Sequence, residues 1–295
     1  MTYPITHNNY SNTAIQLSFW GTRGSTPVAS EETLKFGGNT SCIEISIPGV
    51  DEYLIFDCGT GLKNLGKHIS NNKKTCRKGN IFITHGHWDH IQGFPFFDPF
   101  YDPSFSFTIF IPQQGKYTTK SLIENYLSDK FFPVSTEVFK ANISFKIKKF
   151  QPKYFKHYSV ECMKANHSSN TAIYKLKWEN LSIVYSPDNE VYSEPSTGFL
   201  ENFKEFISGC DALIHDAQYS KDAYKNKKGW GHSAWENVVE IATKCNVKRL
   251  YLTHHDPDST DKDLEKLDEI LKKKHQTEFK DLRLAREGIS VVIPE

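Results

Sequence analysis

The segment ITHGHWDH, residues 83–90, places three histidines and one aspartate within six positions at the end of an apolar run. Imidazole and carboxylate groups are the ligands that zinc and similar divalent metals prefer. Alternate residues of a strand share a face, so His85 and His87 would point one way, and the pair Asp89/His90 would point another. The spacing therefore predicts a site for two adjacent metal ions rather than one. A cluster of surface histidines is the alternative, and the position directly after a strand disfavours it.

The hydrophobic pattern predicts an α/β architecture in which strands come first in a run and then alternate with helices. Short apolar runs bounded by Gly, Pro, Asn or Asp predict strands at 15–20, 41–47, 52–57, 80–85, 107–112, 144–150, 171–178, 181–186, 211–217, 249–254 and 289–294. Helical spacing predicts helices at 60–69, 119–129, 198–209, 233–246 and 262–275. Ser233 and Glu236 predict a capping box at the start of one of these helices.

Composition and charge indicate a soluble globular chain. The 295 residues carry a formal net charge of +1, which calls for neither a nucleic acid nor a membrane surface as partner. No apolar run approaches the roughly 20 residues of a membrane span. We expect a flexible tail over 1–14, without secretory-signal features, and a single domain over 15–295. The six cysteines form no CxxC pair, so we expect free, reduced, buried thiols and a cytoplasmic protein.

Several motifs, taken in order, resemble the phosphodiesterase and ribonuclease Z-like branch of the metallo-β-lactamase superfamily. The segment HGHWDH matches the HxHxDH signature of that superfamily, and the resemblance extends over roughly 15–294. The other motifs are WGTRGSTP, FGGNTSCIEI, LIFDCGTGLKNLG, SPDNE, HDAQY, GWGHS and LTHHDPDSTD. The resemblance implies an αββα four-layer sandwich, the metallo-β-lactamase fold, with the metal site at one edge of the two sheets.

The resemblance also implies a set of metal ligands. The first ion would be bound by His85, His87 and His167, the second by Asp89, His90 and His254, and Asp188 would bridge the two. His255 is the alternative to His254, His167 could instead be a surface histidine, and Asp188 could be a turn former. Two divalent ions are expected, zinc first, with manganese or iron as alternatives, holding a bridging hydroxide that attacks the substrate.

Three further side chains are assigned roles by resemblance. Asp216 in HDAQY would orient His232 in GWGHS, which would contact a phosphate and give a proton to the leaving oxygen, and with Asp89 these are the expected catalytic residues. Otherwise His232 only flanks a helix start. Asp57 would orient a ligand histidine through its second ring nitrogen, the alternative being a helix cap or turn residue. Lysines at 221, 225, 227 and 228 could attract a phosphate or form a solvated loop.

The substrate is narrowed by a missing insertion. Transfer-RNA processing enzymes of this branch usually carry a long arm between the matches to His167 and Asp188, and here these residues are only 21 positions apart (188 − 167). We therefore expect a small phosphodiester, with cyclic nucleotides as the first expectation. Trp88, Trp230 and the aromatic stretch 93–103 could stack on a base, or the stretch could be internal packing.

Other functions stay open at this point. The alternatives are a hydrolase of a lactone, thioester, sulfate or β-lactam, a ribonuclease that lacks the arm, and a binding protein on an inactive fold. No membrane association and no stable nucleic-acid complex are expected. A homodimer is implied by resemblance alone.

Overall fold

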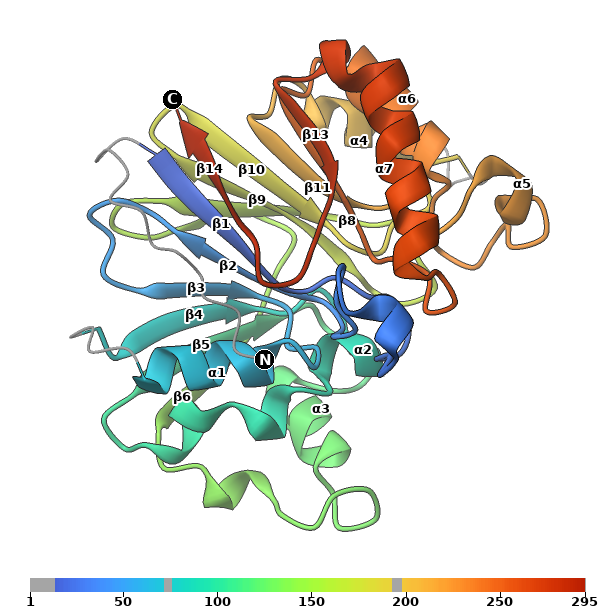
Figure 1. Ribbon diagram of the computed structural model, residues 1–295. Helices are drawn as coiled ribbons and strands as arrows, with labels where there is room; N and C mark the ends of the chain where they lie inside the picture. The colour runs from blue at the N-terminus through green and yellow to red at the C-terminus, as the bar shows by residue number, and fades with distance from the viewer. Residues whose placement is uncertain (1–13, 72–75, 193–197, 295) are drawn as a thin grey trace.

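Two seven-stranded sheets pack face to face, and helices cover the outer face of each (Figure 1). A computed structural model describes residues 14–71, 76–192 and 198–294. This is the expected αββα sandwich. The first strand begins at Ala14, one residue before the expected domain start, and the rest of the predicted tail lies outside the described residues.

The two sheets are built from the two halves of the chain, apart from the last strand. Across the first sheet the order is β14 (Ser290–Pro294), β1 (Ala14–Gly21), β2 (Cys42–Ser46), β3 (Tyr53–Phe56), β4 (Lys78–Phe82), β5 (Ser106–Ile111) and β6 (Asn142–Ile147). Across the second sheet it is β13 (Asp281–Leu284), β12 (Arg249–Thr253), β11 (Ala212–Asp216), β10 (Leu181–Ser186), β9 (Ala172–Trp178), β8 (Ser159–Lys164) and β7 (Lys153–Tyr154).

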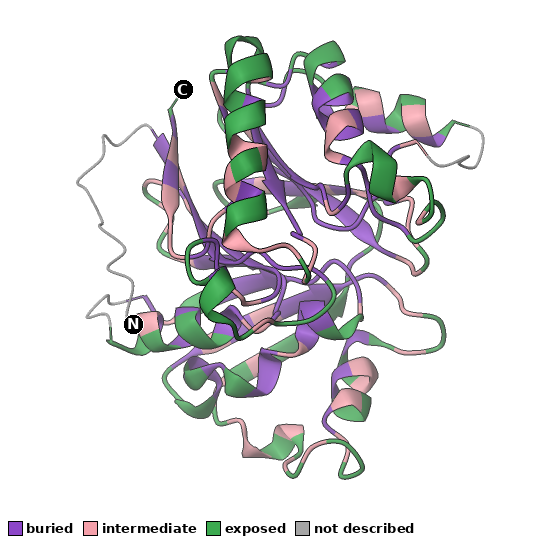
Figure 2. Cartoon of the chain, turned by 45° about the vertical axis from the view of Figure 1, so that its right-hand side comes forward, coloured by how far each residue is buried: buried purple, intermediate pink, exposed green. Residues whose placement is uncertain are grey.

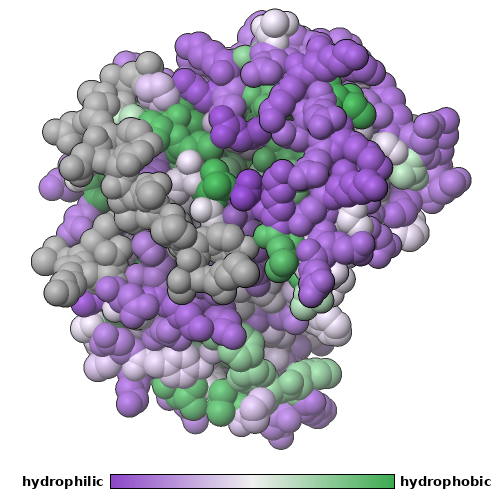
Figure 3. All heavy atoms as spheres, viewed as in Figure 1, coloured by the Kyte–Doolittle hydropathy of each residue, from purple (hydrophilic) through white to green (hydrophobic). Residues whose placement is uncertain are grey.

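Helices form the two outer layers. The first sheet is covered by α1 (Leu62–Asn71) and α3 (Thr119–Tyr126), and the second by α4 (Phe199–Ile207), α6 (Trp235–Lys244) and α7 (Asp261–His275). Two single-turn helices, α2 (Trp88–Ile91) and α5 (Lys221–Tyr224), lie in connections. The outer surface around α7 is hydrophilic (Figure 3). None of the helices in the described ranges combines the length and apolar content that a membrane span requires.

Three hydrophobic clusters hold these four layers together. Alternation along each strand sends successive side chains to opposite faces: Leu54 and Phe56 of β3 enter the cluster between the sheets, while Tyr53 and Ile55 pack under α1. The third cluster lies between the second sheet and its helices. Buried residues accordingly concentrate in the strands (Figure 2).

Strand direction explains where a site can form. The strands β3 to β6 of the first sheet run parallel, as do β10 to β13 of the second. The carboxyl ends of parallel strands meet at one edge of a sheet, and the loops that follow them build sites there. The chain between His167 and Asp188 is the hairpin β9–β10, whose turn consists of Glu179 and Asn180, so no arm is inserted.

Each predicted strand and helix has a counterpart in the structure. Three strands of the structure were not predicted, and one predicted helix cap is wrong. The sequence did not predict β7, β8 or β13. The Ser233/Glu236 capping box is wrong, because α6 begins after Ala234, which makes no side-chain cap. The Ser233 hydroxyl instead donates to the carbonyl of Asn189 at 2.5 Å, and the Glu236 carboxylate accepts from the backbone of Lys221 at 2.9 Å.

Candidate metal centre

The predicted ligand residues come together at the edge where the loops of both sheets meet. His85 and His87 lie in the loop after β4, and Asp89 and His90 lie on the helix α2 that continues it. The second sheet contributes side chains after β8, β10 and β12. Nitrogen and oxygen atoms within 4.8 Å of one another form one group of His85, His87, His167 and Asp188, and a second group of Asp89, His90 and His254.

Asp188 lies between the two groups, and its two oxygens face different histidines. Its Oδ2 is 3.7 Å from Nε2 of His85 and 3.5 Å from Nε2 of His167. Its Oδ1 is 3.0 Å from Nε2 of His90 and 3.2 Å from Nε2 of His254. A carboxylate placed in this way can offer one oxygen to each of two ions.

The geometry separates His254 from His255. The Nε2 atom of His254 is 3.1 Å from Oδ2 of Asp89, inside the cluster. The Nε2 atom of His255 instead donates to the carbonyl of Ala285 at 2.8 Å, and burial lowers the pKa of this histidine to about 3. His254 therefore occupies the position expected for the last ligand, and His255 is a buried structural residue.

The histidines of the first group are held in the neutral form that binds metals. Burial lowers the pKa of His85 well below its usual range, and the neighbouring His90 adds to this effect. Burial also lowers the pKa values of His87 and His167. Neutral imidazole is the protonation state that coordinates an ion. The His87 side chain is exposed, so this group opens to solvent.

The carboxylates concentrate negative charge in the interior. Burial opposes the charge of Asp188, but His254 and His90 hold the pKa of its carboxyl well below the usual value. The pKa of Asp89 is also held well below its usual value against burial, chiefly by His90. Burial would lower the pKa of His90, yet Asp188, Asp89 and Asp57 raise it well above normal. Buried carboxylates at this density require positive charge nearby.

Unsatisfied polar atoms show that the residues fit metal ions. Within the described part of the chain, Nε2 of His85, Nε2 of His90 and Oδ1 of Asp188 are buried and have no hydrogen-bond partner. The last two lie 3.0 Å apart without the angles of a hydrogen bond. Buried groups without partners cost free energy, and coordination of a divalent ion would satisfy all three.

Asp57 supports the centre from behind, as the sequence predicted. Its Oδ2 accepts from Nδ1 of His90 at 2.8 Å and from the hydroxyl of Tyr185 at 3.0 Å, and its Oδ1 accepts from the backbone N–H of Thr84 at 2.7 Å. Donation from Nδ1 leaves Nε2 of His90 facing the centre. Asp57 is fully buried and has a φ of 62°, so it makes these hydrogen bonds from a strained backbone conformation.

Two glycines, which the sequence analysis did not single out, make room for ligand rings. A Cβ atom at Gly24 would lie 2.2 Å from Nδ1 of His254, and one at Gly231 would lie 2.2 Å from Nδ1 of His167. The carbonyl of Gly231 also accepts from Nδ1 of His167 at 3.1 Å, which directs Nε2 to the centre. Both glycines occur in motifs that carried the resemblance, GTRGS and GWGHS.

His232 and Asp216 meet beside the centre. Asp216 is the last residue of β11, and its Oδ2 is 2.8 Å from Nδ1 of His232. Burial alone would lower the pKa of His232, but the charge of Asp216 raises it to about 9. The ring of His232 stacks on His254 with centroids 4.8 Å apart, and its ligand atom lies within 4.8 Å of those of Asp188 and His254. An imidazole with a raised pKa is thus fixed next to the two groups of candidate ligands.

A buried carboxylate that the sequence analysis missed holds the loop of His232. Glu190 accepts from the Tyr224 hydroxyl at 2.5 Å and from the backbone N–H groups of Gly229 and Gly231 at 2.8 and 2.9 Å. It lies in the motif SPDNE two residues after Asp188, and that position was the only available signal.

The surroundings bear on two alternatives that the sequence left open about substrate contacts. Within 93–103, Phe94, Phe97 and Phe100 are fully buried, so this stretch mainly packs the interior, whereas Trp88 and Trp230 are exposed. Three of the four lysines of the 221–228 loop have acidic partners: Lys221 pairs with Glu240, Lys225 with Asp222 and Lys227 with Asp256. These three therefore already have carboxylate neighbours at the surface.

Sequence comparison identifies the family. A family model described as a β-lactamase superfamily domain matches residues 52–255, which includes every candidate ligand. The chain belongs to the metallo-β-lactamase superfamily. Its fold and its family resemblance are thereby confirmed, and it is a hydrolase-fold protein of that family.

Individual relatives within the superfamily are distant. Ribonuclease Z of Picrophilus torridus is 26% identical over 283 residues, which cover 81% of this chain and 85% of that protein. Among solved structures, the metallo-β-lactamase fold protein YhfI from Bacillus subtilis is similar with a TM-score of 0.68 and 19% identity, covering 95% of this chain and 99% of that one. A diphosphatase from the PhnP family has a TM-score of 0.65 and 19% identity, covering 95% of this chain and 100% of its own.

Proposed function

We propose that this metallo-β-lactamase superfamily protein is a metal-dependent phosphodiesterase that hydrolyses small phosphodiesters such as cyclic nucleotides or short oligonucleotides. The observation that carries this proposal is the contact between Asp216 and His232 beside the ligand cluster. Hydrolysis of a phosphodiester expels an alkoxide that needs a proton, and a fixed imidazolium can provide it.

Three side chains of the site have separate proposed roles. Asp216 holds Nδ1–H of His232, which leaves Nε2 as the atom that can contact the phosphate and protonate the leaving oxygen. Asp89 accepts from the backbone N–H of Ser25 at 2.8 Å, which fixes its carboxylate against His254. Two divalent ions on the clustered ligands would polarise the phosphate and lower the pKa of a water molecule towards neutrality.

The size of the substrate follows from the β9–β10 hairpin. A two-residue turn joins the strands between His167 and Asp188, so the insertion that grips transfer RNA in this branch has no counterpart. The net charge of +1 adds no general attraction for a long nucleic acid. The exposed rings of Trp88 and Trp230 could stack on a nucleobase.

A ribonuclease is the second candidate, and one observation favours it. The relative from Picrophilus torridus that shares 26% identity is named ribonuclease Z. Without the arm, an activity of this kind would be directed at short or unstructured RNA rather than at folded transfer RNA.

Three accompanying properties are proposed with the activity. Zinc is the proposed metal, with manganese or iron as alternatives, because the ligands are imidazoles and carboxylates. A cytoplasmic location is proposed because all six cysteines are buried and free. A homodimer is proposed from the family resemblance.

The test is a substrate panel on protein refilled with Zn²⁺ or Mn²⁺. It contains 3′,5′- and 2′,3′-cyclic nucleotides, a short RNA, a lactone and a β-lactam, and His85→Ala serves as the blank. We expect turnover of a phosphodiester, and a loss of about 10²- to 10⁴-fold in kcat in His232→Ala. His275→Ala is the matched control, because His275 forms a similar pair with Glu278, 2.8 Å apart, on the surface.

The outcomes separate the candidates. Turnover of the short RNA without any cyclic nucleotide would remove cyclic nucleotides from the proposed substrates and favour the ribonuclease. Turnover of the lactone or β-lactam alone, or a His232→Ala variant with an unchanged rate, would contradict the proposal.

A further inference from the structure

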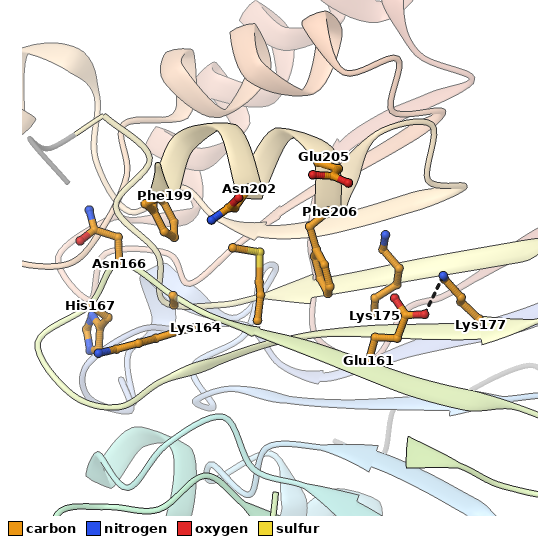
Figure 4. Close-up of a pocket in the computed structure, with 12 residues that line it drawn as sticks. Glu161, Lys164, Asn166, His167, Lys175, Lys177, Phe199, Asn202, Glu205 and Phe206 are labelled. Carbon is orange, nitrogen blue, oxygen red and sulfur yellow. Dashed lines mark ion pairs between the residues drawn. The ribbon is translucent and has the colours of Figure 1, made fainter. Parts of the chain in front are cut away.

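A cavity of about 790 Å³ lies on the outer face of the second sheet, between strands β8 and β9 and helix α4 (Figure 4). Asn166 and His167 line one end, and Lys175 and Lys177 line the other (Figure 4). This volume is within the range of ligand-binding pockets, about 300–1,000 Å³. Because His167 also belongs to the ligand cluster, this end of the cavity lies next to the metal centre.

Lys175 is the unusual feature of the cavity. Its side chain is only 9% exposed, yet within the described residues its ammonium group has neither a hydrogen bond nor an ion pair. The group lies over the ring of Phe206, 4.4 Å from the ring centroid. Burial, and then the charge of Lys177, lowers its pKa. The ammonium group faces the open cavity with no carboxylate within ion-pair distance in the described structure, so an anion that enters the cavity can pair with it.

The other charged groups leave this position cationic. Lys177 is neutralised by Glu161, with 2.7 Å between Nζ and Oε1. Glu205 lies on α4 above the cavity but forms no ion pair with Lys175 in the described structure (Figure 4). Lys164 is exposed and extends towards the His167 end (Figure 4).

Apolar side chains line the space between the charges. Met163, Phe199 and Phe206 form walls of the cavity next to the lysines. Aromatic and thioether surfaces suit the flat face of a nucleobase, and an ammonium group suits a phosphate. The lining therefore combines apolar surfaces with ammonium groups, which match the base and the phosphate of a nucleotide.

We propose that this cavity is a subsite for a terminal phosphate of a short linear oligonucleotide whose scissile phosphate lies at the metal centre. The inference rests on the proposed phosphodiesterase function and narrows its substrate to a chain with a second phosphate. On β9, Ala172 pairs with Lys164 near the His167 end of the cavity, and Lys175 lies three residues further along the strand. At about 3.3 Å per residue, Lys175 is therefore about 10 Å from that end. A group bound at Lys175 is thus a different phosphate from the one that is hydrolysed.

The test measures the activity of the metal-loaded protein on three thymidine dinucleotides. One has no terminal phosphate, one has a 5′-phosphate and one has a 3′-phosphate. We expect one terminally phosphorylated form to have a kcat/KM about 10- to 100-fold above that of the unphosphorylated form, the range that one charge-assisted contact provides. Lys175→Met, which keeps the apolar stem over Phe206, should abolish this preference and leave the rate on the unphosphorylated form unchanged.

The control variant is Lys153→Met. Lys153 lies on the same sheet, is exposed, and also lies over a phenylalanine ring, 5.7 Å from the centroid of Phe155. It should keep the full preference. No preference for either phosphorylated form in the unaltered protein, or an equal loss on all three substrates in Lys175→Met, would overturn the subsite.

A binding measurement separates the subsite from the proposed activity. The same three dinucleotides with an uncharged, uncleavable methylphosphonate linkage would be titrated by calorimetry. Tighter binding with a terminal phosphate, lost in Lys175→Met, supports the subsite even if no dinucleotide is hydrolysed, in which case only the proposed hydrolysis of linear phosphodiesters fails. Equal binding of all three overturns the subsite, whatever the activity.

Discussion

Single residues behind the ligands determine whether the centre can assemble. Asp57 holds the ring of His90 through one oxygen and the loop of Thr84 through the other. It does so in a backbone conformation that an aspartate seldom adopts, so the surrounding contacts must outweigh the strain. Residues that orient metal ligands in this way commonly change metal affinity by 10- to 100-fold when they are replaced.

Replacing Asp57 should therefore weaken metal binding without removing a ligand. We expect Asp57→Asn to lower metal affinity by about 10- to 100-fold, measured by competition with a chelator and metal analysis. Glu52→Gln is the control, because Glu52 stands at the opposite end of β3 and accepts from Asn80 and Tyr158, far from the cluster. Equal affinities of the two variants would contradict the role of Asp57.

Gly231 combines two separate requirements that a pair of variants can distinguish. Its φ is 88°, and a Cβ atom would collide with the ring of His167. Gly229 has a φ of 87° but open space where a Cβ atom would be. Both substitutions to alanine should destabilise the fold by about 1–2 kcal/mol through the left-handed backbone. Only Gly231→Ala should also reduce metal content, as measured by metal analysis after dialysis. Equal metal retention would show that His167 is not held by this contact.

At the scale of elements, one loop connects the two functions of the site. The segment 224–232 carries His232 and also presents the Gly231 carbonyl to His167. The buried carboxylate of Glu190 holds this segment by accepting three hydrogen bonds from it. The position of His232, the proposed proton donor, therefore depends on a residue that follows β10, far away in the sequence.

Loosening this loop should reduce turnover more than substrate binding. We expect Glu190→Gln to lower kcat by about 10-fold or more while KM changes little, since at least one charge-assisted contact is weakened. Amide exchange at Gly229 and Gly231 should become faster in the same variant. Tyr224→Phe, which removes only one of the three hydrogen bonds, should show a smaller effect of the same kind. Unchanged exchange with reduced kcat would exclude a positioning role.

The sequence could predict features that depend on neighbouring residues in the chain, but not features that depend on tertiary contacts. Candidate ligands such as His85 and Asp188 follow apolar strands directly, so pattern and motif together were sufficient to place them in the cluster that the structure forms. The Ser233 cap failed because its hydroxyl is used by Asn189, a contact that spans 44 positions. Glu190 and Lys175 were missed for the same reason, since their roles depend on partners, or on an absence of partners, that arise only from tertiary packing. The burial of Phe94 and Phe97 likewise depended on packing.

At the scale of the molecule, the ligand cluster joins the two sheets. The first group combines His85 and His87 from the loop after β4 with His167 from the second sheet, and the second group combines Asp89 and His90 with His254. Each ion would therefore be bound by side chains from both sheets. Metal binding at such positions adds to the stability of the whole fold.

Removal of the metal should lower the thermal midpoint of the whole domain. With free metal at 1,000 times Kd, each site contributes about 4 kcal/mol, which corresponds to roughly 10 °C for a chain of this size. The measurement is calorimetry before and after chelation, with recovery when Zn²⁺ or Mn²⁺ is restored. Asp188→Asn should show a much smaller response to chelation, and an unchanged midpoint in the unaltered protein would contradict the joining role.

The two-residue turn of Glu179 and Asn180 has an evolutionary consequence. It lies at the end of the β9–β10 hairpin away from His167 and Asp188, which stand before β9 and after β10. A domain could be grafted at this turn, or lost from it, without moving a single catalytic atom. Lineages that share this chemistry could thus exchange one class of substrate for another by changing the length of one hairpin, while the metal-binding loops are inherited intact.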